Sequence, residues 1–131
     1  MQRRNFIQLV SLLPVIAPAM AMAKYSISGY NKLLIQDSPL AGFAYYRGET
    51  LWQHLHINDP LHLAREPDNP YDHRAVAVYW RNHKLGFVPR LENTAISQML
   101  DRGMPMRAQI TRLNVSDNPW DRICFSVYAT V

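Results

Sequence analysis

The sequence is most informative at Leu63-Ala64-Arg65-Glu66-Pro67-Asp68-Asn69-Pro70-Tyr71-Asp72. Pro67 and Pro70 restrict their own backbone angles and cannot donate to a helical hydrogen-bond ladder. The Asp and Asn between them favour turns, because their short side chains bond to the neighbouring backbone. We therefore expect a rigid, non-helical loop between two strands, and such a loop would hold Tyr71 and Asp72 in a fixed place.

Strands are expected on both sides of this loop. Residues 61–66 alternate in part between apolar and polar side chains, which is typical of a half-buried strand. Residues 75–80 (A-V-A-V-Y-W) are apolar on both faces, as in a central strand. Residues 81–83 can turn the chain, so that residues 84–88 return as the hairpin partner.

Three further strands and one helix are expected in the rest of the chain. The strands are predicted at residues 40–46, 106–115 and 123–130. Residues 91–102 change to a helical period, and Gly103 is placed as the C-terminal stop. The apolar face of this helix would consist of Leu91, Ala95, Ile96, Met99 and Leu100.

These elements predict a mainly β fold. About six short strands with one or two short helices are typical of a small OB-like or SH3-like β-barrel. Closure of the barrel would avoid exposed strand edges. Residues 116–121 (S-D-N-P-W-D) have strong turn chemistry and are expected to connect the last two strands.

The first residues of the chain predict an export signal. Arg3 and Arg4 precede an apolar stretch, and small residues end at Ala23, which is a signal-peptidase pattern. A buried N-terminal helix and an uncleaved membrane anchor stay open as alternatives. The expected organisation is a signal peptide at 1–23, a linker or lead-in at 24–38, and a folded domain at 39–131.

The start of this segment, residues 3–8 (R-R-N-F-I-Q), resembles a bacterial twin-arginine signal. Gln2 and Gln8 stand where that pattern commonly has Ser or Thr and Lys. The expected location is therefore outside the cytoplasmic membrane, in the periplasm. Contact with the membrane is expected only through the signal segment.

Charge and cysteine content narrow the class of protein. The 131 residues include 14 Lys+Arg and 10 Asp+Glu, a net charge of +4. Because Arg3 and Arg4 belong to the expected signal, 12 basic and 10 acidic residues, a net +2, remain on the rest of the chain. Nucleic-acid binding would then depend on one small site rather than on a broad positive surface. Cys124 is the one cysteine, so no intramolecular disulfide can form, and we expect a buried structural thiol.

Three runs of the sequence together resemble the HIRAN domain family. They are A-G-F-A-Y-Y-R-G at 41–48, R-E-P-D-N-P-Y-D at 65–72, and K-L-G-F-V-P-R at 84–90. The resemblance spans residues 39–131. It implies a small β-barrel related to the OB-fold that binds DNA, and a helicase-attached member of the family captures the free 3′ end of a single strand.

Carried over by position, the resemblance implies roles for individual side chains. Tyr45 would stack on a terminal base, Tyr71 and Asp72 would lie at its sugar, and Arg90 would meet a backbone phosphate. The chemistry agrees, because aromatic faces accept any base and an arginine fork matches phosphate oxygens. An ionised Asp repels an internal phosphate but accepts a hydrogen bond from a free hydroxyl, which favours a strand end.

Two positions depart from the helicase-attached domain. Phe87 replaces a histidine and could still stack, whereas Ala44 replaces a basic residue, so affinity is expected to be lower. From chemistry alone, Tyr71 and Asp72 could also serve only to pin a turn. Both interpretations of the loop stay open at this point.

Enzymatic and metal chemistry are not indicated by the sequence. Five histidines occur without a recognisable metal spacing and are expected as scattered surface residues: His54, His56, His62, His73 and His83. The sequence has no phosphate-binding loop of an ATPase and no local Ser-His-Asp or Cys-His pattern. No cofactor is expected; zinc is sometimes associated with the family, but no ligand set for it is seen.

The sequence therefore predicts a non-catalytic binding module. The first hypothesis for its function is that it recognises the 3′-hydroxyl end of single-stranded DNA. The alternative is a periplasmic module that reuses the barrel to bind a protein partner, a peptide or a glycan.

Overall fold

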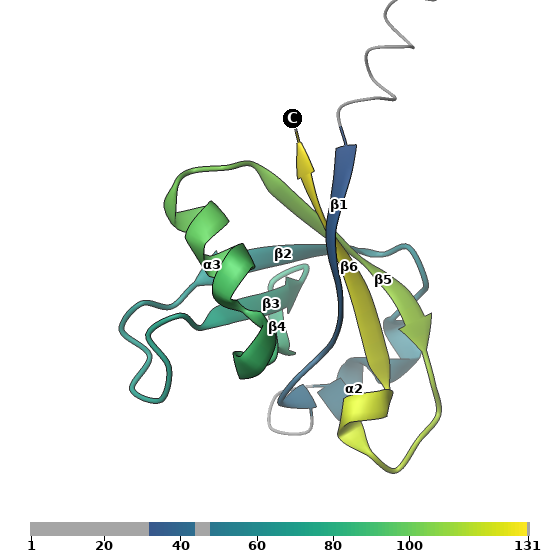
Figure 1. Cartoon of the computed structure of the whole chain (residues 1–131). Coiled ribbons are helices and arrows are strands. Elements are labelled where there is room, and N and C mark those ends of the chain that lie inside the picture. The colour runs from purple at the N-terminus through teal and green to yellow at the C-terminus, as the bar shows by residue number, and fades with distance from the viewer. Residues whose placement is uncertain (1–31, 44–47, 131) are drawn as a thin grey trace, which may run out of the picture. The chain divides into compact units, whose positions relative to one another are not determined.

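The computed structural model describes residues 32–43 and 48–130 (Figure 1). The expected signal peptide at 1–23 lies outside the described residues, as do Ala44 and Tyr45, so export and the role of Tyr45 stay predictions. Residues Leu33–Val131 form one compact unit. No helix within the described part of the chain has the length and apolar character needed to cross a bilayer.

The described unit is built mainly from antiparallel β-strands, as predicted (Figure 1). One sheet has the strand order β1-β6-β5-β2-β3-β4. The strands are β1 (Lys32–Pro39), β2 (Pro60–Arg65), β3 (Val76–Trp80), β4 (His83–Phe87), β5 (Met106–Leu113) and β6 (Ile123–Thr130). The helices are α2 (Gly48–Leu51), the 3-10 turns η2 (Trp52–His54), η3 (Arg90–Glu92) and η4 (Pro119–Asp121), and α3 (Thr94–Asp101).

The two ends of this strand order meet through backbone hydrogen bonds. The chain just after β1 forms an isolated antiparallel bridge with the end of β4, between Ala41 and Phe87. The Ala41 N–H donates to the Phe87 carbonyl at 2.9 Å, and the Phe87 N–H donates to the Ala41 carbonyl at 2.8 Å. The bridge gives the sheet its barrel-like closure, because it joins the chain after β1 to β4 at the other end of the strand order.

The core lies inside this curved sheet. It includes Phe43, Leu63, Val78, Ile110 and Phe125, each less than a tenth exposed. The central position predicted for residues 75–80 is confirmed, because β3 lies between β2 and β4 and its valines and alanine are buried on both faces.

The first strand lies earlier than predicted. Lys32–Pro39 forms β1, where a linker was expected. The prediction of a strand at 40–46 is wrong for residues 40–43, the part of that range that the structure describes. At Gly42 the backbone has φ +78°, which bends the chain away from an extended path. β1 carries half-exposed Leu33 and Leu34 and one fully buried side chain, Ser38, so it lacks the alternation that marks a strand.

The predicted helix is confirmed as α3, but it is shorter and its buried face differs. A 3-10 turn occupies Arg90–Glu92, and the α-helix starts only after Asn93, so the two segments do not share one helical phase. Leu91 is therefore 96% exposed and Ala95 is exposed, against the prediction, while Ile96 is buried. Gly103, at φ +77°, ends the helix as predicted.

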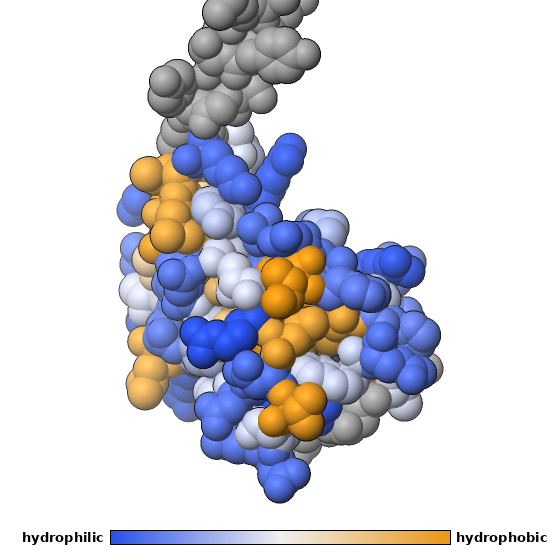
Figure 2. Space-filling view, turned by 90° about the vertical axis from the view of Figure 1, so that its right-hand side faces the viewer, coloured by the Kyte–Doolittle hydropathy of each residue, from blue (hydrophilic) through white to orange (hydrophobic). Residues whose placement is uncertain are grey.

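The outer surface mixes apolar and hydrophilic residues. Figure 2 shows apolar side chains in the middle of one face with hydrophilic ones around them.

Cys124 on β6 is half-buried, whereas a buried thiol was expected. It lies opposite Arg112 of β5. Its side chain points to the outer face of the sheet, between neighbours along β6 that are buried.

Candidate nucleic-acid interface

The loop from β2 to β3 is held by its own side chains. The Asn69 side-chain oxygen accepts hydrogen bonds from the N–H groups of Tyr71 at 2.9 Å and Asp72 at 3.2 Å. At the base of the loop the Glu66 N–H donates to the Ala75 carbonyl at 3.0 Å. The predicted non-helical loop is confirmed, and it presents the Tyr71 side chain 83% exposed.

The Asp72 carboxylate is fixed by two donors. The Arg74 N–H donates to Oδ1 at 3.0 Å, and the amide of Asn93 donates to Oδ2 at 2.7 Å. Burial opposes ionisation, but these two bonds and the positive charges of Arg90 and Arg74 outweigh it and hold the pKa of Asp72 below its usual value. Asp72 therefore pins the turn, which is one of the two interpretations that the sequence left open. It is also an ionised hydrogen-bond acceptor with a fixed orientation.

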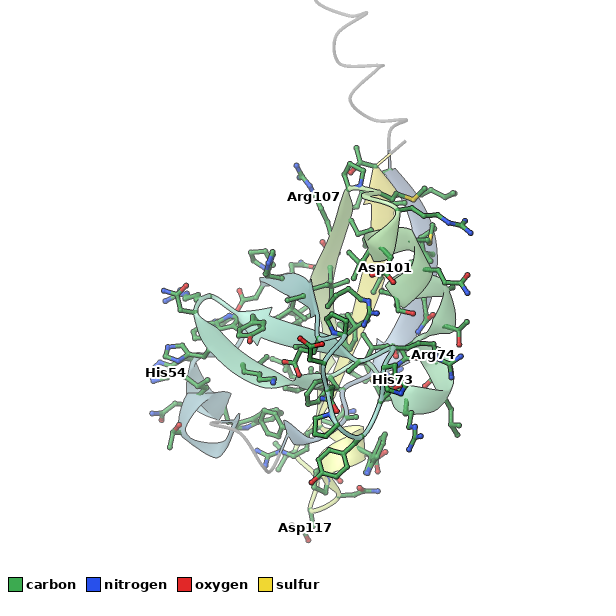
Figure 3. The ribbon with its side chains drawn as sticks, turned by 90° about the vertical axis from the view of Figure 1, so that its left-hand side faces the viewer. His54, His73, Arg74, Asp101, Arg107 and Asp117 are labelled. Carbon is green, nitrogen blue, oxygen red and sulfur yellow. The ribbon has the colours of Figure 1, made fainter. Side chains whose placement is uncertain are left out.

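Arg65 fastens the loop to α3. Its guanidinium donates to the carbonyls of Ala75 at 2.8 Å and His73 at 3.0 Å. The same group forms a two-pronged ion pair with Asp101, at 2.8 and 3.3 Å. Figure 3 shows Asp101 of α3 near the loop that carries His73 and Arg74. This role was not foreseen, because sequence alone does not tell which carbonyls an arginine reaches.

A surface pocket of about 370 Å³ opens beside this loop. Its lining comes from the β2–β3 loop, from β4 and its continuation, from the chain after β1, and from η4. The lining residues are Ala41, Gly42, Glu66, Asn69, Pro70, Tyr71, Asp72, Ala75, Lys84, Phe87, Val88, Arg90 and Trp120. Four of the five site residues expected from the sequence, Tyr71, Asp72, Phe87 and Arg90, thus surround one pocket, and the fifth, Tyr45, lies outside the described residues.

Trp120 is a pocket residue that the sequence analysis treated only as part of a turn. The Asn118 side chain accepts a hydrogen bond from the Trp120 N–H at 3.1 Å and so caps η4. The indole is 51% exposed although tryptophan is usually well buried. A tryptophan in a polar turn was the available signal, because nothing in a turn requires so large an aromatic side chain.

Charges in the pocket are balanced. Glu66 pairs with Lys84 at 2.6 Å, and the Lys84 ammonium lies 4.5 Å from the centre of the Phe87 ring. Burial disfavours the charged form of Glu66, but hydrogen bonds from Lys84 and Asn69 and the Lys84 charge hold the pKa of Glu66 below its usual value. With Asp72 and Arg90, the lining has two acidic and two basic side chains.

The histidines are exposed or half-buried, but they are not scattered as expected. His54, His56 and His83 line a second hollow, and His62 lines a hollow beside it. The histidines come together because the β3–β4 turn packs beside η2 and the residues that follow it. Within residues 32–43 and 48–130 no group of three or more His, Cys, Asp or Glu side chains is placed to hold a metal ion.

The fold and the pocket define a small, barrel-like β domain with an aromatic surface site. A family model described as "HIRAN domain" matches residues 34–131. The chain belongs to the HIRAN domain family. HIRAN domains are generally binding domains that are non-catalytic on their own. Membership of the family suggests a module that binds nucleic acid. The match begins within β1, which agrees with the earlier start of the fold.

Two solved structures share the fold. A Lactobacillus plantarum protein has a TM-score of 0.66 at 22% identity, over 75% of this chain and 94% of its own. The HIRAN domain of human HLTF has a TM-score of 0.56 at 18% identity, over 76% of this chain and 78% of its own. No curated protein matches the sequence.

Proposed function

We propose that this protein is a nucleic-acid-binding module that takes the 3′-hydroxyl end of a DNA single strand into the pocket beside the β2–β3 loop. The observation that carries the proposal is the conjunction, at one pocket, of exposed aromatic rings with an oriented carboxylate. Membership of the HIRAN family supports the class of ligand.

The aromatic side chains supply the affinity for bases. Tyr71 is 83% exposed and Trp120 is 51% exposed, and both line the pocket with the half-buried Phe87. Every base has a face that stacks on such rings, and each stacked base contributes about 1–3 kcal/mol. The pocket can therefore hold bases without reading their identity.

The carboxylate favours a strand end over a strand middle. Asp72 is ionised at neutral pH, because an aspartate pKa is ordinarily well below 7 and that of Asp72 is lowered further, so it repels a phosphate at the same position. Each of its oxygens accepts one hydrogen bond within the protein, at 3.0 and 2.7 Å, and a carboxylate oxygen has room for a second. A terminal 3′-hydroxyl can donate that second bond.

Arg90 is placed for the phosphate on the 5′ side of the terminal sugar. It is exposed on η3, lines the pocket and lies near enough to Asp72 to lower the pKa of that carboxyl. Since Lys84, the other basic side chain of the lining, pairs with Glu66, the contact between Arg90 and one phosphate is expected to dominate the salt dependence, with a slope near −0.7 for single strands.

The test compares two otherwise identical oligonucleotides, one ending in a 3′-hydroxyl and one in a 3′-phosphate. Fluorescence anisotropy at low salt is expected to show tighter binding of the 3′-hydroxyl strand by the full chain. Asp72→Asn keeps the shape and the acceptor for the Arg74 N–H but removes the charge, so it is expected to erase the preference.

One control variant separates end recognition from general binding. Asp68→Asn removes an exposed charge of the same loop that does not line the pocket, and it is expected to keep the preference. Equal affinity for both strand ends in the unmodified protein, or binding to neither, contradicts the proposal and favours the alternative of a protein, peptide or glycan ligand.

A further inference from the structure

A second hollow lies at the turn between β3 and β4. It has a volume of about 490 Å³, and its lining includes His54, His56, Asp59, Trp80, Arg81 and His83. A neighbouring hollow shares Asp59, Trp80 and Arg81 with it and adds His62. Four of the five histidines of the chain therefore gather around the same three residues, and none of them lines the pocket beside the β2–β3 loop.

The floor of this hollow is held in place by Asp59. Its Oδ2 accepts a hydrogen bond from the Trp80 indole N–H at 2.9 Å and another from the His56 backbone N–H at 2.9 Å. Trp80 is 5% exposed, so its ring is part of the core. The position of His56 is thus tied to β3 through one carboxylate.

Cationic and potentially cationic groups stack on this floor. The Arg81 guanidinium carbon lies 4.4 Å from the centre of the Trp80 ring. The His83 imidazole stacks on the same ring, with centroids 6.2 Å apart and planes 24° apart. Stacking uses the face of the guanidinium, so the N–H donors along its edge can still bind an anion.

We propose that this hollow is a binding site for a phosphate-bearing anion and that it is switched on by protonation of its histidines. Arg81 and Asp59 carry opposite charges, so they offset each other near neutral pH. Histidine is the side chain that commonly changes its charge in mildly acidic solution, and each of His54, His56 and His83 that is protonated adds one positive charge to the hollow. His62 lies beside them in the neighbouring hollow. Protonated imidazoles and an arginine edge are donors for phosphate oxygens.

A phosphate fits this chemistry better than a metal ion. Within the described residues, His54, His56, His83 and Asp59 do not form a group placed to share one ion. Figure 3 shows His54 at the opposite edge of the molecule from His73 and Arg74 of the β2–β3 loop. The site is therefore distinct from the proposed pocket for a strand end and does not depend on it.

The experiment uses the full chain and two probes at constant ionic strength. One probe is inorganic pyrophosphate, and the other is hexathymidylate with a 3′-phosphate, which the proposed strand-end site disfavours. Calorimetric titration is expected to show binding that is on the order of tenfold tighter at pH 5.5 than at pH 7.5 for at least one probe. A lower pH does not add negative charge to either probe, so the gain would come from the protein.

Three variants assign the gain to this hollow. The combined change His54→Gln, His56→Gln and His83→Gln keeps polar side chains and is expected to remove the pH dependence. Arg81→Gly removes the guanidinium, and glycine suits the φ of +53° at this position, so the turn keeps its conformation. It is expected to weaken binding at pH 5.5, whereas His73→Gln, on the β2–β3 loop, is expected to leave it unchanged.

The outcomes separate the sources of the phosphate. A gain for both probes, or for the oligonucleotide alone, assigns the site to a nucleic-acid backbone, and a gain for pyrophosphate alone assigns it to a small phosphate compound; each supports the site. The proposal is overturned if neither probe binds more tightly at pH 5.5, or if the triple histidine variant keeps the full pH dependence.

Discussion

Ala41 and Phe87 exchange two backbone hydrogen bonds, of 2.9 and 2.8 Å, between the chain after β1 and the end of β4. Both residues also line the pocket beside the β2–β3 loop. The bridge that closes the barrel is thus part of the wall of the candidate site. Damage to the closure is expected to affect ligand binding as well as stability.

Gly86→Ala tests this coupling. A Cβ at Gly86 would lie 2.1 Å from the Ala41 carbonyl oxygen, so the two backbones would have to separate. We expect a loss of roughly 1–3 kcal/mol in the free energy of unfolding, measured by urea denaturation, together with weaker oligonucleotide binding.

Gly103→Ala is the matched control for that change. A Cβ at Gly103 would meet nothing within 4 Å, so its cost comes only from the φ of +77°. We expect a loss of about 1 kcal/mol in stability with no change in binding. Equal effects of the two changes on binding would contradict the coupling.

Arg65→Lys tests how the loop is held. A lysine cannot reproduce the planar fork that bonds to Ala75, His73 and Asp101 together. Because the His73 carbonyl loses the Arg65 donor and the Ala75 carbonyl keeps only the Glu66 N–H, we expect a loss of about 1–3 kcal/mol in stability. Hydrogen exchange in residues 66–75 is expected to speed up.

Asp101→Asn separates the helix contact of Arg65 from its loop contacts. The Asp101 side chain is 55% exposed, so loss of the ion pair is expected to cost less than about 1 kcal/mol. Exchange in residues 66–75 is expected to stay slow in this variant. Fast exchange would show that the ion pair, and not the two carbonyl contacts, holds the loop.

The parts of the fold that were predicted depend on local signals. Pro67 and Pro70 restrict their own backbone, and Asn69 bonds to residues close to it in the sequence, so the loop can be predicted from the sequence. Residues 75–80 show their burial through an unbroken apolar run. Gly103 marks the end of α3 because few other residues accept its φ.

The parts that were missed depend on contacts between distant segments. β1 forms at one end of the sheet with most side chains exposed or half-buried, so it shows no alternation. Trp120 and Lys84 reach the pocket because η4 and β4 fold against the β2–β3 loop. Asn93 is 21 residues from Asp72 in the sequence, so only folding brings the two side chains to a hydrogen-bond distance of 2.7 Å.

The lowered pKa of Asp72 predicts how stability depends on pH. A carboxyl whose folded pKa is depressed stabilises the protein above its unfolded pKa, and this contribution is lost as pH falls through the folded pKa. The stabilisation is thus fully present well above the unfolded pKa of about 3.9 and declines as the pH falls below it. Urea denaturation is expected to show Asp72→Asn less stable than the unmodified protein at pH 7 and the difference shrinking below about pH 4.

Trp120→Ala tests whether the tryptophan missed in the sequence takes part in binding. If a base stacks on its half-exposed indole, truncation is expected to weaken oligonucleotide binding by about 1–3 kcal/mol, roughly 5- to 150-fold. The stability cost is expected to be small, because half of the side chain already faces water. Leu91→Ala removes a more exposed apolar side chain that does not line the pocket, and it is expected to leave affinity unchanged.

Trp120→Phe adds an optical test to the affinity measurement. Of the three tryptophans, Trp80 is buried and Trp52 is half-buried, so a stacking base is expected to quench mainly Trp120. Phenylalanine keeps an aromatic face, so we expect Trp120→Phe to retain most of the affinity while losing most of the quenching. Full quenching in this variant would place the bound strand away from η4, because a base that still quenches must then lie against Trp52 or Trp80.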